Sequence, residues 1–132
     1  MIFVDTSFWV ALRNQRDGHH EAAKRLLLEH GDTQLATTNH VRGETWTFLR
    51  RRAGHHAAVG FLDVVDRSPR ITIAHVTEEA EERALAWLRR HDEREYSFVD
   101  ATSFTAMRSM RIVEALCFDG DFAAAGFTEL RA

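Results

Sequence analysis

The sequence predicts an α/β fold in which a parallel sheet is flanked by helices on both faces. Short apolar segments alternate along the chain with longer segments of helical periodicity, and this alternation is typical of parallel strands covered by the intervening helices. No internal repeat, low-complexity tract or linker interrupts the pattern. The length of 132 residues suits a single domain over residues 1–132 that buries one core.

The first half of the chain is expected to hold two strands and four helices. In chain order these are a strand at 2–4, helices at 6–14 and 17–31, a strand at 33–38, and helices at 40–52 and 55–67. The first strand is the apolar run Ile-Phe-Val, and helical spacing of apolar residues follows it. The second helix starts near Asp17 and stops at Gly31. Thr38 or Asn39 caps the third helix, and Gly54 separates it from the fourth.

The second half of the chain is expected to hold three strands and three helices. In chain order these are a strand at 71–76, helices at 77–93 and 96–111, a strand at 114–119, a short helix at 120–126 and a strand at 127–131. The helix at 77–93 is strongly amphipathic, with acids in its first turn and arginines in its last. The helix dipole favours this charge distribution, which strengthens the prediction.

Composition and charge exclude several classes of protein. The single cysteine, Cys117, cannot form an internal disulfide or a cysteine-rich zinc site, which fits a reducing compartment. No apolar run approaches the roughly 20 residues of a membrane helix, and residues 1–12 lack the features of a signal peptide. We therefore expect a cytoplasmic protein without a membrane partner. The net charge of −3 argues against a nucleic-acid binder that relies on an overall positive charge.

Four acidic residues stand out by their positions in the predicted strands and helices. Asp5 and Asp119 each end a predicted strand, and open parallel sheets bind their ligands at the carboxyl ends of their strands. Asp100 lies in the apolar stripe of its helix, and Glu44 lies at the rim of the apolar face of the helix at 40–52. Each acid also has a structural explanation. Asp5 and Asp119 can cap the next helix, Asp100 can form a capping box with Ser97, and Glu44 can extend into solvent. These explanations are adequate for one residue and less so for four.

A group of carboxylates suggests a metal site. Like charges repel, so one of the acids would be protonated unless a cation offset their charge. Oxygen ligands without histidine or cysteine favour Mg2+ or Mn2+. Because such ions activate water and neutralise charge on a phosphoryl group, the acids suggest hydrolysis of a phosphodiester.

The motifs that carry these acids resemble those of PIN domains, in particular the short VapC-type toxins of bacterial toxin–antitoxin pairs. The matching segments are VDTS, the glutamate of VRGETW, SFVDATSF and CFDGDF, in that order and over nearly the whole chain. The resemblance implies a PIN-like domain with Mg2+-dependent endoribonuclease activity, in which Mn2+ can substitute. It also implies an RNA substrate, inhibition by a co-encoded VapB-type antitoxin, and a homodimer.

The resemblance assigns roles to individual residues. Asp5, Glu44, Asp100 and Asp119 match the acidic quartet of the family. Asp5 and Asp100 match the usual metal contacts, while the others hold waters or tune the site. Ser7 matches a hydroxyl or amide position near the metal.

The fourth acid remains open at this point. The segment FDGDF offers both Asp119 and Asp121, and we favour Asp119 because it directly follows the predicted strand. We also hypothesise that three consecutive arginines on the helix of Glu44 line the approach of the RNA; these are Arg50, Arg51 and Arg52.

Two other functions are considered. A phosphoaspartate protein, either a phosphatase or a receiver domain, also carries acids at strand ends. Both of these classes resemble arrangements that use a lysine near the phosphoryl group. The only lysine, Lys24, is predicted to be solvated. A non-catalytic interaction module could keep the fold alone, and a cleavage assay distinguishes it. For partner binding we expect an apolar patch formed by Phe8, Trp9 and Trp46, provided that these side chains are exposed.

Overall fold

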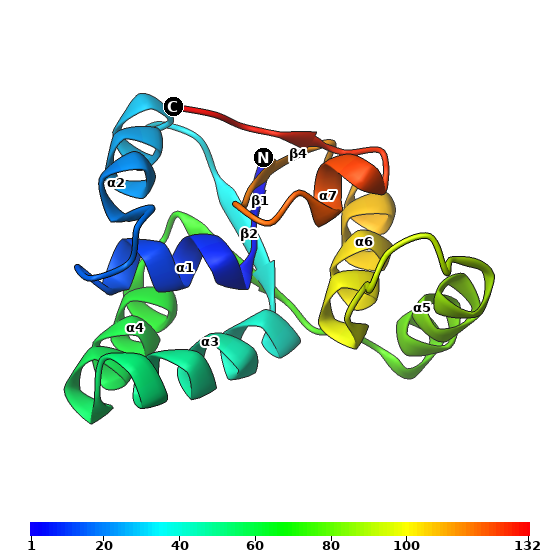
Figure 1. Ribbon diagram of the computed structural model, residues 1–132, viewed down its shortest axis with the longest axis horizontal. Coiled ribbons are helices and arrows are strands. Elements are labelled where there is room, and N and C mark those ends of the chain that lie inside the picture. The colour runs from blue at the N-terminus through cyan, green and yellow to red at the C-terminus, as the bar shows by residue number, and fades with distance from the viewer.

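The computed structural model describes residues 1–132 and contains a five-stranded sheet with seven helices (Figure 1). All strand pairs are parallel, in the order β3-β2-β1-β4-β5. The predicted α/β fold is therefore confirmed. In chain order the elements are β1 (Ile2–Val4), α1 (Thr6–Arg13), α2 (His20–Glu29), β2 (Leu35–Thr38), α3 (Asn39–Arg52), α4 (His55–Arg67), β3 (Ile71–Ala74), α5 (Glu78–Arg90), α6 (Phe98–Met110), β4 (Glu114–Leu116), α7 (Asp121–Ala124) and β5 (Thr128–Glu129).

Strand β1 occupies the centre of the sheet, and its position determines where a ligand can bind. Phe3 pairs with Ala36 of β2 on one side and with Ala115 of β4 on the other. Figure 1 shows α1 to α4 on one side of the central strands and α5 to α7 on the other. The connections that leave β1 and β4 therefore diverge, which opens a crevice at the carboxyl ends of these two strands.

Several predicted elements are shorter in the structure than in the sequence-based prediction. The second helix begins at His20 and not near Asp17, because the Asp17 carboxylate accepts a hydrogen bond from the His19 backbone N–H (2.8 Å) and forms a turn. The strand predicted at 114–119 ends at Leu116. The Phe118 N–H donates to the Ser7 hydroxyl (3.0 Å) and not to a neighbouring strand. Asp119 therefore lies in the loop between β4 and α7, so the expectation that it directly follows the strand was wrong.

The core is one cluster of 26 buried apolar residues. Phe104 of α6 is at the centre of its aromatic part, with ring centroids 4.9 Å from Phe122, 5.3 Å from Trp87, 5.5 Å from Phe127 and 5.7 Å from Tyr96. Most of these pairs are edge to face, the arrangement that aromatic quadrupoles favour. This cluster joins α5, α6 and α7 into one layer.

The apolar patch expected for partner binding does not form. Phe8 and Trp9 are 0% and 2% exposed, and Trp9 packs edge-on against Phe61 of α4. Trp46 is half-buried and also packs against the core. These aromatic residues therefore stabilise the fold and do not form an exposed interface. No helix has both the length and the apolar character needed to cross a membrane.

Phe104→Ala tests the role of the aromatic cluster. Because Phe104 is fully buried among four other rings, we expect the free energy of unfolding to fall by about 3–5 kcal/mol. Chemical denaturation of the variant and of the unsubstituted protein measures this change. The control is Leu28→Ala, since Leu28 is 81% exposed and should change stability by less than about 0.5 kcal/mol. Equal effects of the two substitutions would contradict this prediction.

Candidate active site

A pocket of about 420 Å³ opens at the carboxyl ends of β1 and β4. Its lining is mainly polar and includes seven carboxylates: Asp5, Asp17, Glu44, Glu95, Asp100, Asp119 and Asp121. The cationic side chains in the lining are Arg52 and, when protonated, His19. The four acids that the sequence analysis grouped are thus brought together, and Asp121 accompanies them.

Asp5 lies at the base of the pocket and is 3% exposed. It caps α1, with its carboxylate accepting hydrogen bonds from the Ser7 backbone N–H (3.2 Å) and the Ser7 hydroxyl (2.9 Å). Burial raises the pKa of Asp5 to about 8, with a further increase from the charges of Asp119 and Asp100, despite the opposing hydrogen bonds from Ser7. Asp5 therefore binds a proton near neutral pH unless a cation replaces it.

Ser7 connects Asp5 to the other side of the pocket. Its hydroxyl donates to Asp5 and accepts from the Phe118 backbone N–H. One side chain thus joins the start of α1 to the loop that carries Asp119. This bond spans 111 positions in the sequence and ties together the two segments that carry Asp5 and Asp119.

Asp100 has a structural role and also faces the pocket. Its carboxylate accepts from the Ser97 N–H (3.0 Å), and its own N–H donates to the Ser97 hydroxyl (2.9 Å), which forms the predicted capping box. At the same time Asp100 lines the pocket and is 7% exposed. Burial raises its pKa to about 6, with contributions from Asp119 and Asp121, although the Ser97 N–H bond acts in the opposite direction. The two explanations offered for this residue are therefore compatible.

The loop after β4 supplies two more carboxylates. Asp119 accepts a hydrogen bond from the Asp121 N–H (3.1 Å), and the Arg94 Nε donates to the Asp121 carboxylate (2.8 Å). Asp121 is thus paired with a cation, whereas Asp119 is not. Partial desolvation and the charge of Asp121 raise the pKa of Asp119. Carboxylate oxygens of Asp100, Asp119 and Asp121 lie within 4.8 Å of one another.

Helix α3 forms the opposite wall of the pocket. Glu44 is half-buried and lines the pocket, as its place at the rim of the apolar face predicted. Arg52 also lines the pocket, and its guanidinium lies 4.8 Å from the ring centroid of Phe48. Arg50 and Arg51 are exposed and do not line it. A helix turns by about 100° per residue, so three consecutive arginines cannot all face the same pocket.

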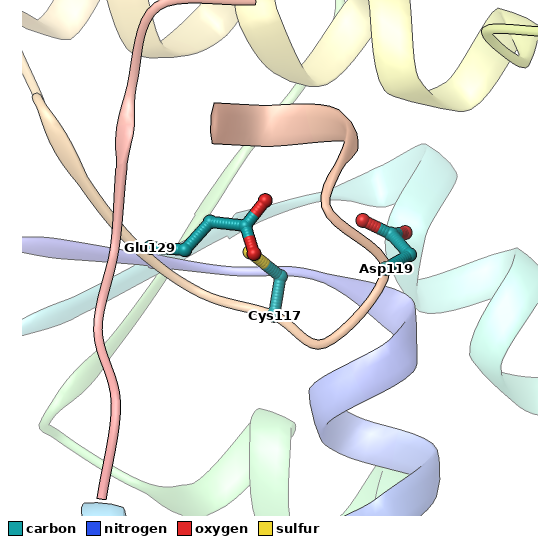
Figure 2. Close-up of side chains that lie close together, drawn as sticks. All are labelled: Cys117, Asp119 and Glu129. Carbon is teal, nitrogen blue, oxygen red and sulfur yellow. The ribbon is translucent and has the colours of Figure 1, made fainter. Parts of the chain in front are cut away.

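A second cluster lies directly behind the loop that carries Asp119. Figure 2 shows the Glu129 carboxylate of β5 next to the Cys117 sulfur. Asp119 lies two residues after Cys117 on the segment that follows β4. The Glu129 side chain is 2% exposed and accepts from the Ala123 N–H and from Arg131, both at 2.8 Å. Burial raises the pKa of Cys117, so its thiol stays neutral. Because the Glu129 carboxylate is already bonded on both oxygens, we interpret the cluster as support for α7 and not as a metal site.

Several residues of the pocket were not predicted from the sequence. The ring of His19 stacks on Phe118 at 4.4 Å and borders the acids. Glu95 lies in the pocket lining, and Arg94 donates to the Asp121 carboxylate. None of these residues lies in a motif of regular spacing, because all of them come from connections between elements.

The donor set of the pocket fits a divalent metal ion. Its acidic side chains offer only oxygen ligands, as Mg2+ and Mn2+ prefer. Burial and neighbouring carboxylates raise the pKa values of Asp5 and Asp100, and neither residue forms an ion pair with a cationic side chain of the protein. A bound cation would offset their negative charge.

Comparison with known proteins identifies the family. Residues 2–128 match the PIN domain. The chain belongs to the PIN domain family. Its relatives include the 23S rRNA-specific endonuclease VapC20 of Mycobacterium tuberculosis, found in two strains, at 56% identity over 131 residues. This match covers 99% of the present chain and 98% of the relative.

Solved structures agree with this assignment to the PIN domain family. The crystal structure of M. tuberculosis VapC20, described as a sarcin-ricin loop cleaving toxin, has a TM-score of 0.94 at 55% identity and covers 100% of both chains. VapBC2 from Rickettsia felis, solved with a DNA fragment from its promoter, has a TM-score of 0.71 at 12% identity and covers 98% of both chains. The latter shows the shared fold alone. The resemblance to VapC-type PIN domains and the predicted nuclease class are thereby confirmed.

Asp5→Asn tests the electrostatics of this PIN-domain pocket. Because the pKa of Asp5 is about 8 in the folded protein and about 4 when unfolded, the folded state holds an extra proton between these values. Without metal, the free energy of unfolding should therefore fall as pH rises, by at most about 1.4 kcal/mol per pH unit. Asparagine caps helices about as well as aspartate and removes this dependence. The stability of Asp5→Asn relative to the unsubstituted protein should thus increase from pH 5 to 8.

Denaturation in EDTA across this pH range measures the difference. The control is Asp66→Asn, which changes an exposed carboxylate on α4 and should leave the pH dependence as it is. A constant difference between Asp5→Asn and the unsubstituted protein would mean that Asp5 is ionised throughout.

Proposed function

We propose that this protein is a divalent-metal-dependent endoribonuclease that hydrolyses a phosphodiester bond of ribosomal RNA. The proposal rests on one observation: buried and partly buried carboxylates converge in a pocket whose own cations do not neutralise them. Such a set needs a bound cation to be fully ionised. The PIN fold and the 56% identical relative named as a 23S rRNA endonuclease support the reaction class and the substrate.

We infer that the target is the sarcin-ricin loop of 23S rRNA. The crystal structure of VapC20 is described as that of a sarcin-ricin loop cleaving toxin. The present chain is 55% identical to it over its full length, with a TM-score of 0.94. A backbone this similar would present the pocket to the same RNA in the same orientation.

The residues of the pocket would have different roles in the reaction. Asp5 and Asp100 would hold the cation, Mg2+ or its substitute Mn2+, and Glu44 and Asp119 would orient water around it, with Asp121 in a secondary place. A bound cation would lower the pKa of a water molecule and neutralise charge on the scissile phosphate. Ser7 keeps the Asp5 carboxylate in one orientation through its hydroxyl and its backbone N–H. Asp5 would release its proton when the cation binds.

Arg52 is the arginine best placed to guide RNA into the pocket. It is exposed at the end of α3 and lines the pocket wall. Its planar guanidinium can donate two hydrogen bonds to one phosphate. Arg50 and Arg51 would contact RNA farther from the reaction site.

Partners and domain extent follow from the same proposal. Residues 1–132 would form one PIN domain that acts as a cytoplasmic toxin, is inhibited by a VapB-type antitoxin and forms a homodimer. The VapC-type relatives support the antitoxin. A phosphoaspartate mechanism receives no support, because Lys24 is exposed, pairs with Glu21 at 3.2 Å and does not line the pocket.

An RNA cleavage assay tests the proposed reaction. The protein should cleave an RNA that contains the sarcin-ricin loop with Mg2+ or Mn2+, and EDTA should stop the reaction. Asp5→Asn and Asp100→Asn should each lower the rate at least about 100-fold, because a lost metal ligand costs more than a lost outer contact. Asp66→Asn should retain full activity. Cleavage that persists in excess EDTA would refute the metal mechanism, and a folded protein that cleaves no RNA would favour the interaction module.

Thermal unfolding tests the metal site without relying on activity. A ligand at 100 times its Kd stabilises the folded state by about 2.7 kcal/mol, which corresponds to roughly 5–15 °C for a chain of this size. We expect Mn2+ to raise the Tm of the unsubstituted protein and of Asp66→Asn by this amount. Asp5→Asn and Asp100→Asn should lose most of the shift. Equal shifts in all four proteins would place the metal elsewhere.

A further inference from the structure

A second groove, of about 880 Å³, runs between α5 and α6, outside the acidic pocket. We call it the α5–α6 groove. Arg83 and Arg90 line it from α5, and Arg108 and Ser109 line it from α6. Trp87 of α5 and His91, at the end of α5, also line it, with their rings stacked at 4.1 Å.

The charge of the α5–α6 groove is opposite to that of the pocket. No carboxylate lines it, and three arginines do. All three are exposed, and none forms an ion pair within the protein. Unpaired guanidinium groups gathered in one concavity attract anions, even though the net charge of the chain is −3.

The lining favours nucleic acid over a protein partner. Only Ala86 and Trp87 of the eight lining residues are apolar, and Trp87 is 8% exposed. The Arg108 guanidinium lies 5.8 Å from the Trp87 ring centroid and 5.3 Å from that of Phe127. The groove therefore offers no apolar anchor of the kind that forms the centre of a protein interface. It offers arginine forks and hydroxyl groups, which suit phosphate.

The α5–α6 groove is close to the acidic pocket. Both are bordered by the connection between α5 and α6, with His91 at the groove, Arg94 bonded to the loop of Asp119, and Glu95 in the pocket lining. Three residues of chain span at most about 10 Å, so His91 and Arg94 are near neighbours. On α6, Asp100 and Arg108 are about 12 Å apart along the helix axis. One RNA strand can therefore contact both places.

We propose that the α5–α6 groove binds the phosphate backbone of the RNA substrate beside the scissile bond, through Arg83, Arg90 and Arg108. This inference rests on the proposed function, because it assumes that RNA occupies the acidic pocket. The groove would supply affinity and register for a long RNA, while the pocket carries out cleavage. The attraction between the groove and the RNA phosphates would then offset part of the repulsion between the acidic pocket and the RNA.

Arg83→Gln/Arg90→Gln tests the proposal, since both residues are exposed on α5 and should be replaceable without unfolding. Each phosphate contact on a single strand contributes about 0.7 to the slope of log K against log salt concentration. The binding of a sarcin-ricin loop RNA is measured in an Asp5→Asn background, which prevents cleavage. Because two contacts are removed, we expect the magnitude of the slope to be about 1.4 smaller for the double variant than for Asp5→Asn alone. In the active background the KM for this RNA should rise about 10-fold or more, with kcat unchanged.

Arg25→Gln/Arg67→Gln is the matched control, because it removes the same charge from exposed positions on α2 and α4. It should leave the salt slope and the KM nearly unchanged. A short RNA that spans only the cleavage site should be cut equally by the unsubstituted protein, the α5 double variant and the control variant, all with Asp5 in place. If the α5 double variant and the control behave alike, the groove does not bind RNA. If the α5 variant instead alters the oligomeric state in size-exclusion chromatography, the groove is an interface between chains and the proposal is wrong.

The test separates this inference from the proposed function. If the unsubstituted protein cleaves no RNA in Mg2+ but binds RNA with a salt slope that depends on Arg83 and Arg90, the nuclease assignment fails and the groove stands. If it cleaves RNA with a KM that does not depend on these residues, the groove fails and the nuclease assignment stands.

Discussion

Repulsion between carboxylates at the carboxyl ends of β1 and β4 is the constraint on which the rest of this structure depends. Burial raises the pKa values of Asp5 and Asp100, and partial desolvation raises that of Asp119. The charge of Asp119 raises the pKa values of Asp5 and Asp100 further. A fold that holds such groups together must offset their repulsion with local interactions. The protein does so with hydrogen bonds from the backbone and from Ser7, so the pocket is preorganised at a cost to stability.

Two of the acids are held by interactions that also begin their helices. Asp5 caps α1 and Asp100 closes the capping box of α6. Glu129 of β5 also supports this region. Its buried carboxylate accepts a hydrogen bond from the Ala123 N–H and so stabilises α7 beside Asp119. Structural and functional explanations of these acids are thus not alternatives. The Asp5 and Asp100 carboxylates, which cap helices, also line the pocket.

Charge is separated over the surface of the protein. Carboxylates gather in the pocket, while unpaired arginines gather at the end of α3 and in the α5–α6 groove. The net charge of −3 averages over these regions and so says little about the affinity for phosphate. A polyanionic substrate would meet the arginines first and would reach the carboxylates only where a bound cation would offset their negative charge.

The sequence by itself determined the order of strands and helices, the family and the acids that converge, because these depend on local periodicity, capping residues and motif order. Tertiary structure alone decided the rest. In the folded protein Trp9 is buried, and of the three consecutive arginines only Arg52 lines the pocket. Asp119 lies in a loop that is bonded to Ser7 and not at the end of a strand. Folding also brought Arg83 and Arg108 to one groove. Such outcomes depend on contacts between residues far apart in the chain, and the spacing of neighbouring residues carries no information about those contacts.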